Sequence, residues 1–488
     1  MPEQHTPAAV TRDDPQAPST GSGLIIGVMV VAAFVMILNE TIVSIALPDL
    51  AVVMSVTTTT VQWLISGFLL TMAVVIPTTG YLLQRFSPRR IFLMAIGSFA
   101  AGTLLCAVAP TFPALLIGRM VQACGTAVMI PLVMTTVMRL VPPSRRGATM
   151  GTISIVIGVA PAIGPTVGGA ILAAFGWRWM FWLVLILALA MFTVGIARLH
   201  VPNETRRVPL DLVSVALSAI GFAGIVYGLA SIGQGGGVLP PWASLVIGVA
   251  GIALFVWRQG RLQRQDRPLL DLRTLTRPRF RLALILSLFL FMALIGAGAI
   301  LLPIYLQNVL DHGTLVAGLA LLPGGLAMAA VARPVGALYD RVGARPLVIP
   351  GAIGMTVALW ILALLGGGAP LGAVIAAHVL LMLSLGLMMT PLMTDSLSAL
   401  PSDLYSHGSA LLATLQQVAG ALGSAVFVTV AALGSASPGG IPDATGIRAG
   451  FMVAGGIGLV AVVVACLFKR PDPAEAADVT DALADSGG

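Results

Sequence analysis

The sequence predicts an all-α polytopic membrane protein with fourteen transmembrane helices and both termini in the cytoplasm. Of its 488 residues, 58% are hydrophobic and only 9% are charged, whereas an average soluble domain carries roughly 25% charged residues. Apolar runs of roughly 18 to 25 residues recur along the chain, and each is long enough to cross a hydrocarbon core of about 30 Å. The loops between these runs alternate between basic and nearly uncharged, which indicates the orientation of the chain in the membrane.

Fourteen apolar runs have the length of a span, and we take each of them as a helix. The polar segment before the first run contains Pro and two Asp, so we expect a cytoplasmic tail rather than a cleavable signal peptide. The expected spans lie near residues 24–48, 61–83, 91–109, 113–138, 148–174, 179–199, 211–232, 242–258, 281–305, 314–338, 347–365, 371–393, 408–432 and 448–468.

Positive charge is concentrated on one side of the predicted spans. Of the 26 Lys and Arg residues, all but Arg119, Arg178 and Arg448 fall on the side of such loops as "QRFSPRR", "RLVPPSRRG" and "RQGRLQRQDRPLLDLRTLTRPRFR". Because cytoplasmic loops hold the excess of Lys and Arg, this side is predicted to be cytoplasmic. The net charge of +7 is therefore a topology signal and not the footprint of a nucleic acid. Asp211 and Asp311, at span boundaries, are expected to be solvated.

The chain repeats itself at an almost constant offset. "GYLLQRFSPRR" at 80–90 matches "GALYDRVGARP" at 336–346, and "VPPSRRGA" at 141–148 matches "LYSHGSA" at 404–410 more loosely. Two copies of a six-helix unit, related by a pseudo-two-fold axis, with two inserted helices between them explain this pattern. The expected units are a cytoplasmic tail at 1–23, a six-helix bundle at 24–200, the inserted helices and a basic loop at 201–280, a second six-helix bundle at 281–468 and a disordered acidic tail at 469–488.

Four stretches together carry a family resemblance that covers essentially the whole chain: "LNETIVSIALP", "QWLISGFLLTMAVVIPTTGYLLQRF", "GVAPAIGPTVGG" and "LYSHGSALLATLQQVAGALG". The chain resembles the major facilitator superfamily, in its fourteen-helix drug:proton antiporter branch, and most resembles the lincomycin-exporter-like multidrug subgroup. The resemblance implies a monomeric multi-pass protein of the bacterial cytoplasmic (inner) membrane. It also implies export of lipophilic or cationic small molecules by alternating access, driven by a proton gradient without a cofactor. A dedicated exporter of one metabolite, antibiotic or lipid is the alternative.

Glu40 lies within the first apolar run, where an unpaired carboxylate costs on the order of 3 kcal/mol or more. It is eight residues before Pro48, and Arg119 of the fourth run is six residues after Pro113, so both lie at about 9 to 12 Å from the outer end. A carboxylate that exchanges its proton for an arginine or for a cationic drug suits an antiporter. The alternatives are a static ion pair or a glutamate bonded to the backbone, and, for Arg119, a side chain that snorkels to the interface.

The resemblance assigns proton coupling to the region of Glu40, Asn39 and Arg119. Relatives often carry "LDxT" in the first span, whereas this chain has Asn39 at the aspartate position and its acid one residue later, about 100° around the helix. Glu40 thus lies on a different face of the helix from the family's aspartate, and it is the only acidic residue clearly within a span of the first half.

Two further motifs of the family are expected to act in conformational change. The first is a latch at the cytoplasmic ends of the helices, and its first copy has Gln84 and Ser87 where the family has an acid and a second glycine, so this copy should be weaker. The other is an antiporter motif in the fifth span, expected to seal it against the second half. The latch residues are Gly80, Arg85, Arg89, Arg90, Gly336, Asp340, Arg341 and Gly343, and the antiporter-motif residues are Gly158, Pro161, Gly164, Pro165, Gly168 and Gly169.

Polar, aromatic and methionine side chains within the spans are candidates for the substrate cavity, although helix packing or lipid contact is an equal alternative for each. They are Gln62, Trp63, Gln122, Met134, Tyr305, Gln307, His378, Gln416 and Gln417. His378 and Asp395 are titratable groups within spans of the second half; we expect them to be structural, with proton coupling as the alternative. The sequence has no nucleotide-binding loop, catalytic motif or metal-ligand spacing, so we expect a transporter that is no enzyme and binds lipid, drugs and protons but no nucleic acid.

Overall fold

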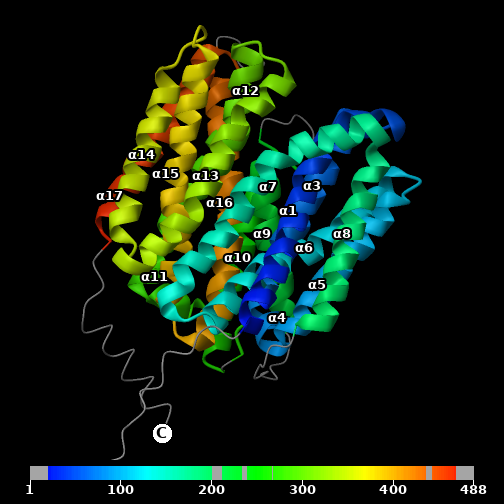
Figure 1. Ribbon diagram of the computed structural model, residues 1–488, viewed down its shortest axis with the longest axis vertical. Coiled ribbons are helices and arrows are strands. Elements are labelled where there is room, and N and C mark those ends of the chain that lie inside the picture. Colours follow the sequence, from blue (N-terminus) through cyan, green and yellow to red (C-terminus); the bar gives the residue numbers. More distant parts are fainter. Residues whose placement is uncertain (1–19, 200–210, 233–238, 266, 436–441, 469–488) are drawn as a thin grey trace, which may run out of the picture.

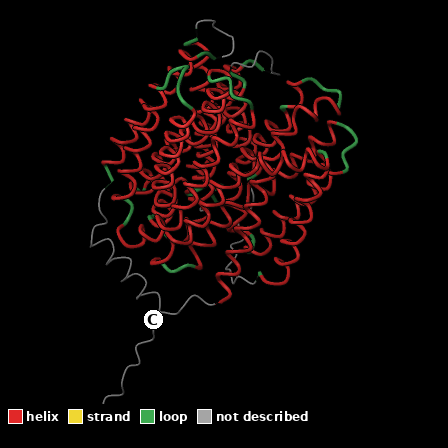
Figure 2. Tube along the Cα trace, turned by 45° about the horizontal axis from the view of Figure 1, so that its top comes forward, coloured by secondary structure: helices red, strands yellow, loops and turns green. Residues whose placement is uncertain are grey.

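The computed structural model describes residues 20–199, 211–232, 239–265, 267–435 and 442–468, and every regular element within them is helical (Figure 2). Most of the expected N-terminal tail and all of the expected C-terminal tail lie outside these residues. Thirteen helical segments in the described part are long and apolar enough to span a membrane, and a pair of segments at 143–161 and 166–175, bent relative to each other, makes a fourteenth. The fourteen predicted spans are confirmed.

The first half of the chain forms six spans, of which the second is divided into several pieces. Ser87 caps α5 by accepting a hydrogen bond from the Arg90 amide, and Pro88 follows at the first helical position. The elements are α1 (Thr20–Val53), α2 (Thr58–Val61), α3 (Trp63–Val75), η1 (Ile76–Thr78), α4 (Thr79–Arg85), α5 (Pro88–Ala107), α6 (Phe112–Leu140), η2 (Pro143–Arg145), α7 (Arg146–Phe175) and α8 (Trp177–Arg198).

The rest of the chain adds two inserted spans and six more. The span that opens the second half is unusual, because η4 and η5 have the wide turns of a π-helix. The elements are α9 (Leu212–Ala230), α10 (Pro241–Gln263), η3 (Leu272–Thr276), α11 (Pro278–Phe291), η4 (Met292–Leu301), α12 (Leu302–Ile304), η5 (Tyr305–Val309), α13 (Thr314–Val342), α14 (Arg345–Leu364), α15 (Leu371–Ser398), η6 (Ser402–Leu404), α16 (Tyr405–Leu433) and α17 (Ala444–Cys466).

The helices form two groups that converge towards the bottom of the view in Figure 1 and diverge towards the top. In one group α1 packs on α7 and α8, and α5 packs on α6 and α8; in the other, α14 packs on α15 and α17, and α13 on α15. The inserted helices α9 and α10 pack on each other, and α9 contacts both α3 of the first group and α16 of the second. The insertion therefore lies beside both halves.

An ion pair at one end holds the inserted helices together. Arg258 of α10 donates to both carboxylate oxygens of Asp211, at 2.7 and 2.8 Å, and Asp211 also caps the start of α9. The Arg258 guanidinium lowers the pKa of Asp211 to about 2. The expectation that Asp211 is simply solvated was therefore wrong, because Arg258, in the second half of α10, comes back beside it.

The two halves meet most closely where α7 crosses α13, near the basic end of each helix. Gly147 of α7 lies directly on Gly336 of α13, and a Cβ atom at either position would overlap the backbone of the other helix or its Asp340 carboxylate. A Cβ atom at Gly151 would come within 2.5 Å of the Ala332 carbonyl oxygen. Small residues one turn apart thus allow the helix backbones to approach each other.

Further contacts between the halves lie at the same end. Thr135 of α6 and Ser409 of α16 share a hydrogen bond of 2.9 Å between their hydroxyl oxygens, and Arg139 donates to the Ser406 hydroxyl at 3.4 Å. Gly80 of α4 lies against the backbone and ring of His407. These contacts close the protein at the end that carries the basic loops.

Replacing Gly336 by Ala should weaken this closed end, because the added methyl group would meet the Gly147 carbonyl group. We expect cysteine reagents applied from the basic side to label a probe cysteine at Ser406, which is fully buried in the closed form, faster in Gly336→Ala than in the parent. Gly318→Ala in the same helix is the control, because nothing lies within 4 Å of its added Cβ atom. Equal labelling rates in the two variants would contradict the role of this helix crossing.

Candidate functional site

Arg119 is completely buried in the first half, on α6. Its Nε donates to the Leu64 carbonyl oxygen at 3.3 Å, its Nη1 donates to Gln122 Oε1 at 3.1 Å, and its guanidinium lies 4.3 Å from the centroid of the Phe68 ring. Its remaining nitrogen, Nη2, is buried with no hydrogen-bond partner among the described residues. The alternative that Arg119 snorkels to the interface was wrong, since the side chain is bonded to α3 across the helix interface.

Gln122 connects this arginine to α5. Its Oε1 accepts from Arg119, and its Nε2 donates to Thr103 Oγ1 at 2.8 Å, while the Thr103 hydroxyl donates to the Phe99 carbonyl oxygen at 2.6 Å. Gly102 and Gly118 allow this approach, because a Cβ atom at Gly102 would meet the Gln122 backbone. The chain of hydrogen bonds fixes the guanidinium in one orientation.

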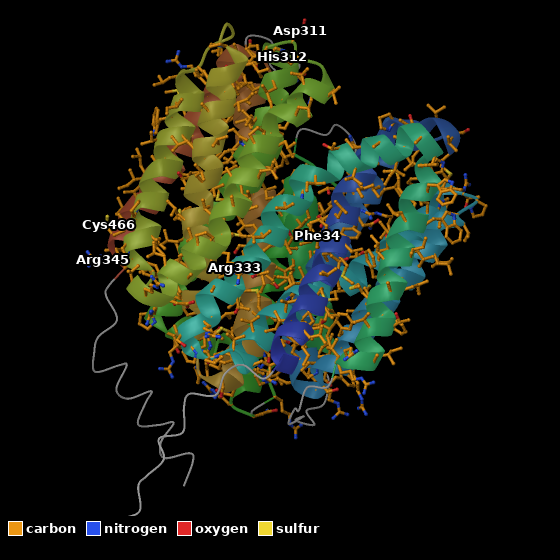
Figure 3. All side chains as sticks on the ribbon, viewed as in Figure 1. Phe34, Asp311, His312, Arg333, Arg345 and Cys466 are labelled. Atoms are coloured by element: carbon orange, nitrogen blue, oxygen red, sulfur yellow. The ribbon has the colours of Figure 1, made fainter. Side chains whose placement is uncertain are left out.

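Glu40 lies in the middle of α1, six residues after Phe34, which marks that helix in Figure 3. The carboxylate and Arg119 interact electrostatically, but they form no direct ion pair, and no hydrogen bond to another described residue holds the carboxylate. The neighbouring Asn39 is 1% exposed, and its Nδ2 also has no partner in the described part of the chain. A static ion pair, one of the alternatives, is therefore not the arrangement here.

The antiporter motif lies where α7 bends. The helical segments at 143–161 and 166–175, on either side of the bend, are inclined by 46° to each other. Prolines are the usual cause of such bends. Thr41, the residue after Glu40, packs into the bend, with its hydroxyl 3.5 Å from the Ala160 carbonyl oxygen and in contact with the position that a Cβ atom of Gly164 would occupy. The motif is thus in direct contact with the helix turn that carries the acid.

The glycines of this motif face in different directions. A Cβ atom at Gly158 would lie 3.4 Å from Met328 Sδ of α13, in the second half, whereas Gly168 lies against Ile42 of α1. Gly169 has open space beside it and Pro161 is exposed; the side chain of Pro165 lies outside the described residues. Contact with the second half therefore comes from Gly158 together with Gly147 and Gly151, and Gly164 and Gly168 pack within the first half.

The second copy of the latch joins the halves through a carboxylate. Asp340 Oδ1 accepts from the Gly147 amide at 2.7 Å and Oδ2 from the Ala148 amide at 2.9 Å, so this acid on α13 caps the start of α7. Gly343 ends α13 with a φ of +79°, which suits glycine. The corresponding residue of the first copy, Ser87, has a φ of −65° and caps a helix instead, so no glycine is needed there.

The latch arginines differ in their contacts. Arg89 Nη2 donates to the Ile196 carbonyl oxygen at 2.7 Å, in the last turn of α8. The side chains of Arg85, Arg90 and Arg341 form no hydrogen bond or ion pair to other described residues and are half-buried or exposed.

The candidates for the substrate cavity are dispersed over several helices. Gln122 and Met134 are fully buried on α6, and Tyr305 is buried with its hydroxyl donating to the Gly366 carbonyl oxygen at 2.8 Å. Trp63 stacks on Tyr227 of α9, with ring centroids 6.0 Å apart, and so lies against the insertion. Of the others, Gln62 is exposed, Gln307 and Gln417 are half-buried, and Gln416 is buried with an unpartnered Nε2. Gln417 bridges the halves, since its Nε2 lies 3.9 Å from Met72 Sδ.

Asp395 and His378, two titratable groups within spans of the second half, are both buried among neighbouring helices. Asp395 is fully buried and accepts from Arg279 Nε at 2.9 Å and from the Tyr339 hydroxyl at 3.2 Å. His378 is 3% exposed and packs on Gly324. Neither group lies beside Glu40 and Arg119.

The structure also brings in residues that the motifs did not indicate. Thr103 extends the hydrogen bonds from Arg119, Thr41 contacts the bend of α7, and Gly147 and Gly151 form the helix crossing. The spacing of the last two, small residues at i and i+4, is a signal of helix contact that the sequence does contain.

The chain resembles known proteins over most of its length. The model of the Major Facilitator Superfamily matches residues 29–424. The lincomycin resistance protein LmrB of Listeria monocytogenes is 39% identical over 411 residues, which cover 84% of this chain and 86% of that protein. Its namesake in Bacillus subtilis is 38% identical over 457 residues, 91% of this chain and 95% of the other. A multidrug resistance protein B homolog of Mycobacterium tuberculosis is 30% identical over 404 residues, 82% and 74% of the two chains.

Among solved structures, the human organic anion transporter MFSD10 superposes with a TM-score of 0.65 at 17% sequence identity, over 92% of this chain and all of that one. At this sequence identity, the similarity shows that the two proteins share a fold. The apolar spans and the bacterial relatives indicate a multi-pass protein of the cytoplasmic membrane. The chain belongs to the Major Facilitator Superfamily of transporters.

Proposed function

We propose that this transporter exports lipophilic, often cationic, drugs from the cytoplasm in exchange for protons, and that Glu40 is the group for which proton and drug compete. The observation that carries the proposal is a fully buried arginine, Arg119, that has one nitrogen without a partner and forms no ion pair with Glu40, an acid at a similar depth in the first span. The names of the relatives, which refer to lincomycin and multidrug resistance, support the class of substrate.

The surroundings of Arg119 keep it charged and stationary. Moving a charge out of water costs several kcal/mol, so a buried arginine needs compensating partners. The Leu64 carbonyl, the Gln122 amide oxygen and the Phe68 ring each provide part of this compensation, but Nη2 remains without a partner. Neither this nitrogen nor the Glu40 carboxylate forms a hydrogen bond or an ion pair with the described residues.

Competition at Glu40 couples the two fluxes. In the form closed at the basic end, Glu40 accepts a proton from the outer side and its attraction to Arg119 ends. After the halves rock to the other form, the proton leaves to the cytoplasm, and the carboxylate becomes available to a cationic drug. A proton that enters down 100 mV releases about 2.3 kcal/mol from the potential alone, which drives the exchange.

The bend of α7 links this chemistry to the movement of the halves. Thr41 packs against Gly164 at the bend, while Gly147, Gly151 and Gly158 of the same helix face α13. A change at the level of Glu40 therefore reaches the contact between the halves through one helix.

Glu40→Gln should abolish proton-driven transport, because the amide cannot release a proton. We expect inverted membrane vesicles with the wild-type protein to accumulate ethidium under an imposed proton gradient and to lose it when a protonophore is added. Vesicles with Glu40→Gln should show neither effect at equal protein content.

Asp311→Asn is the matched control, since Asp311 is an exposed acid in a loop whose φ of +53° asparagine tolerates. Unchanged accumulation by Glu40→Gln would refute the role of this residue. Proton-driven transport of lincomycin but not of ethidium would instead favour the alternative, a dedicated exporter of one compound.

Gly164→Ala should reduce transport severalfold, because its Cβ atom would overlap the Thr41 hydroxyl and fix α1 against the bend. Gly169→Ala in the same motif has open space beside it and should transport as the wild type does. The initial rate of ethidium uptake per amount of folded protein distinguishes the two, and equal rates would show that the contact with Thr41 is irrelevant.

A further inference from the structure

A cavity of about 790 Å³ lies at the basic end of the second half. Residues of α11, α13, α14 and α15 form its wall, together with Phe468 just after α17. Arg345, the first residue of α14, lines the cavity and is exposed, and Figure 3 shows it at the outer edge of the second half. Because α13 ends and α14 begins here, the cavity lies at the membrane surface that the loop charges predict to be cytoplasmic.

The described residues that line this cavity carry a net positive charge. Arg279 and Arg345 are its cations, and Asp395 is its acid. Asp395 Oδ1 accepts from Arg279 Nη2 at 2.5 Å and from the Tyr339 hydroxyl at 3.2 Å, and Oδ2 accepts from Arg279 Nε at 2.9 Å. The carboxylate therefore balances Arg279, whereas Arg345 forms no hydrogen bond or ion pair with other described residues. The charge of one guanidinium is left for a ligand.

A phosphate group that carries one negative charge matches this arrangement. The planar guanidinium of an arginine donates two parallel hydrogen bonds to phosphate oxygens. The backbone amides of Ala344 and Arg345, at the start of α14, donate to no other described residue, and they add to the attraction for an anion. Both oxygens of Asp395 already accept hydrogen bonds, so the cavity favours a headgroup without an ammonium group.

An apolar ridge leads from the cavity along the outer face of α14. Ile349, Ile353 and Val357 follow one another at intervals of four residues, so each lies above the last on the helix surface. Ile349 lines the cavity, and the side chains of Ile353 and Val357 are 47% and 46% exposed. Exposed apolar side chains of a membrane span contact the acyl chains of lipids. An anion site that continues into such a ridge has the two parts that a phospholipid requires.

We propose that this cavity binds an anionic phospholipid of the phosphatidylglycerol type from the leaflet on the basic side. Arg345 and Arg279 bind the headgroup phosphate, and an acyl chain follows Ile353 and Val357 along α14. Anionic lipids are attracted to basic groups at the cytoplasmic surface, and basic pockets between spans suit their headgroups. Lipid binding at this site is independent of the drug and of Glu40, so it can fail or succeed separately from the proposed function.

The test measures lipid affinity on the purified, full-length protein in detergent. Native mass spectrometry gives the apparent Kd of the first phosphatidylglycerol or phosphatidylethanolamine molecule that binds. We expect the wild type to bind phosphatidylglycerol severalfold more tightly, and Arg345→Gln to lose this preference. Arg345→Lys, which keeps the charge, should retain most of it. Arg281→Gln is the matched control, because Arg281 is an exposed arginine of α11 that does not line the cavity.

Two results would overturn the proposal. Equal affinities of folded, monodisperse Arg345→Gln and Arg281→Gln for phosphatidylglycerol would show that lipid coats the bundle without using the cavity. Displacement of phosphatidylglycerol by an excess of inorganic phosphate would assign the cavity to a soluble anion. We expect no displacement, because inorganic phosphate has no acyl chain to place on the ridge of α14.

Discussion

The burial of the Arg119 charge is the constraint on which the rest of the site depends. A guanidinium with no exposed surface must be compensated within the helix bundle, and the chain uses Leu64 from α3, Gln122 from α6 itself and, through Gln122, Thr103 from α5. Glycines at 102 and 118 make this possible by letting α5 and α6 approach each other. The compensation is incomplete at one nitrogen, and this leaves the cation able to act on a carboxylate whose own charge changes.

Close approach of helix backbones is the second constraint, and it serves conformational change. Between α7 and α13, Gly147, Gly151 and Gly336 leave no room for a side chain. In a membrane, where helices gain little from the hydrophobic effect, such packing and a few hydrogen bonds decide which form is stable. The Asp340 cap on α7 and the long hydrogen bond of 3.4 Å that Gln84 donates on the opposite side show that the two halves are not joined symmetrically, although their sequences repeat.

Much of the fold could be predicted from the sequence because lipid imposes simple rules. Span length and loop charge identify all fourteen helices, although α1 continues to Val53, past the expected end at Pro48, since a proline near the end of a span does not have to end it. The partners of buried groups could not be predicted in the same way. Nothing in the sequence indicates that Asp211 meets Arg258 or that Tyr227 stacks on Trp63, because both contacts depend on how the inserted helices return to the bundle.

In the candidate site, too, some features could be predicted from the sequence and others could not. The depth of Glu40 and Arg119 follows from counting residues along two antiparallel spans, and the motif glycines identify α7. The direction in which each glycine faces depends on the 46° bend of that helix, so that Gly158 faces the second half while Gly164 meets Thr41. A regular helix drawn from the sequence cannot represent that change of direction.

Competition of proton and drug for Glu40 is tested most directly by measuring protons released when drug binds. Purified protein in weakly buffered detergent solution, at a pH where the binding site is protonated, is titrated with ethidium while a pH indicator records the release. We predict a release from the wild type that saturates together with binding, and none from Glu40→Gln, even at ethidium concentrations that saturate the variant. Equal release from both proteins would contradict the assignment of Glu40 as the shared site.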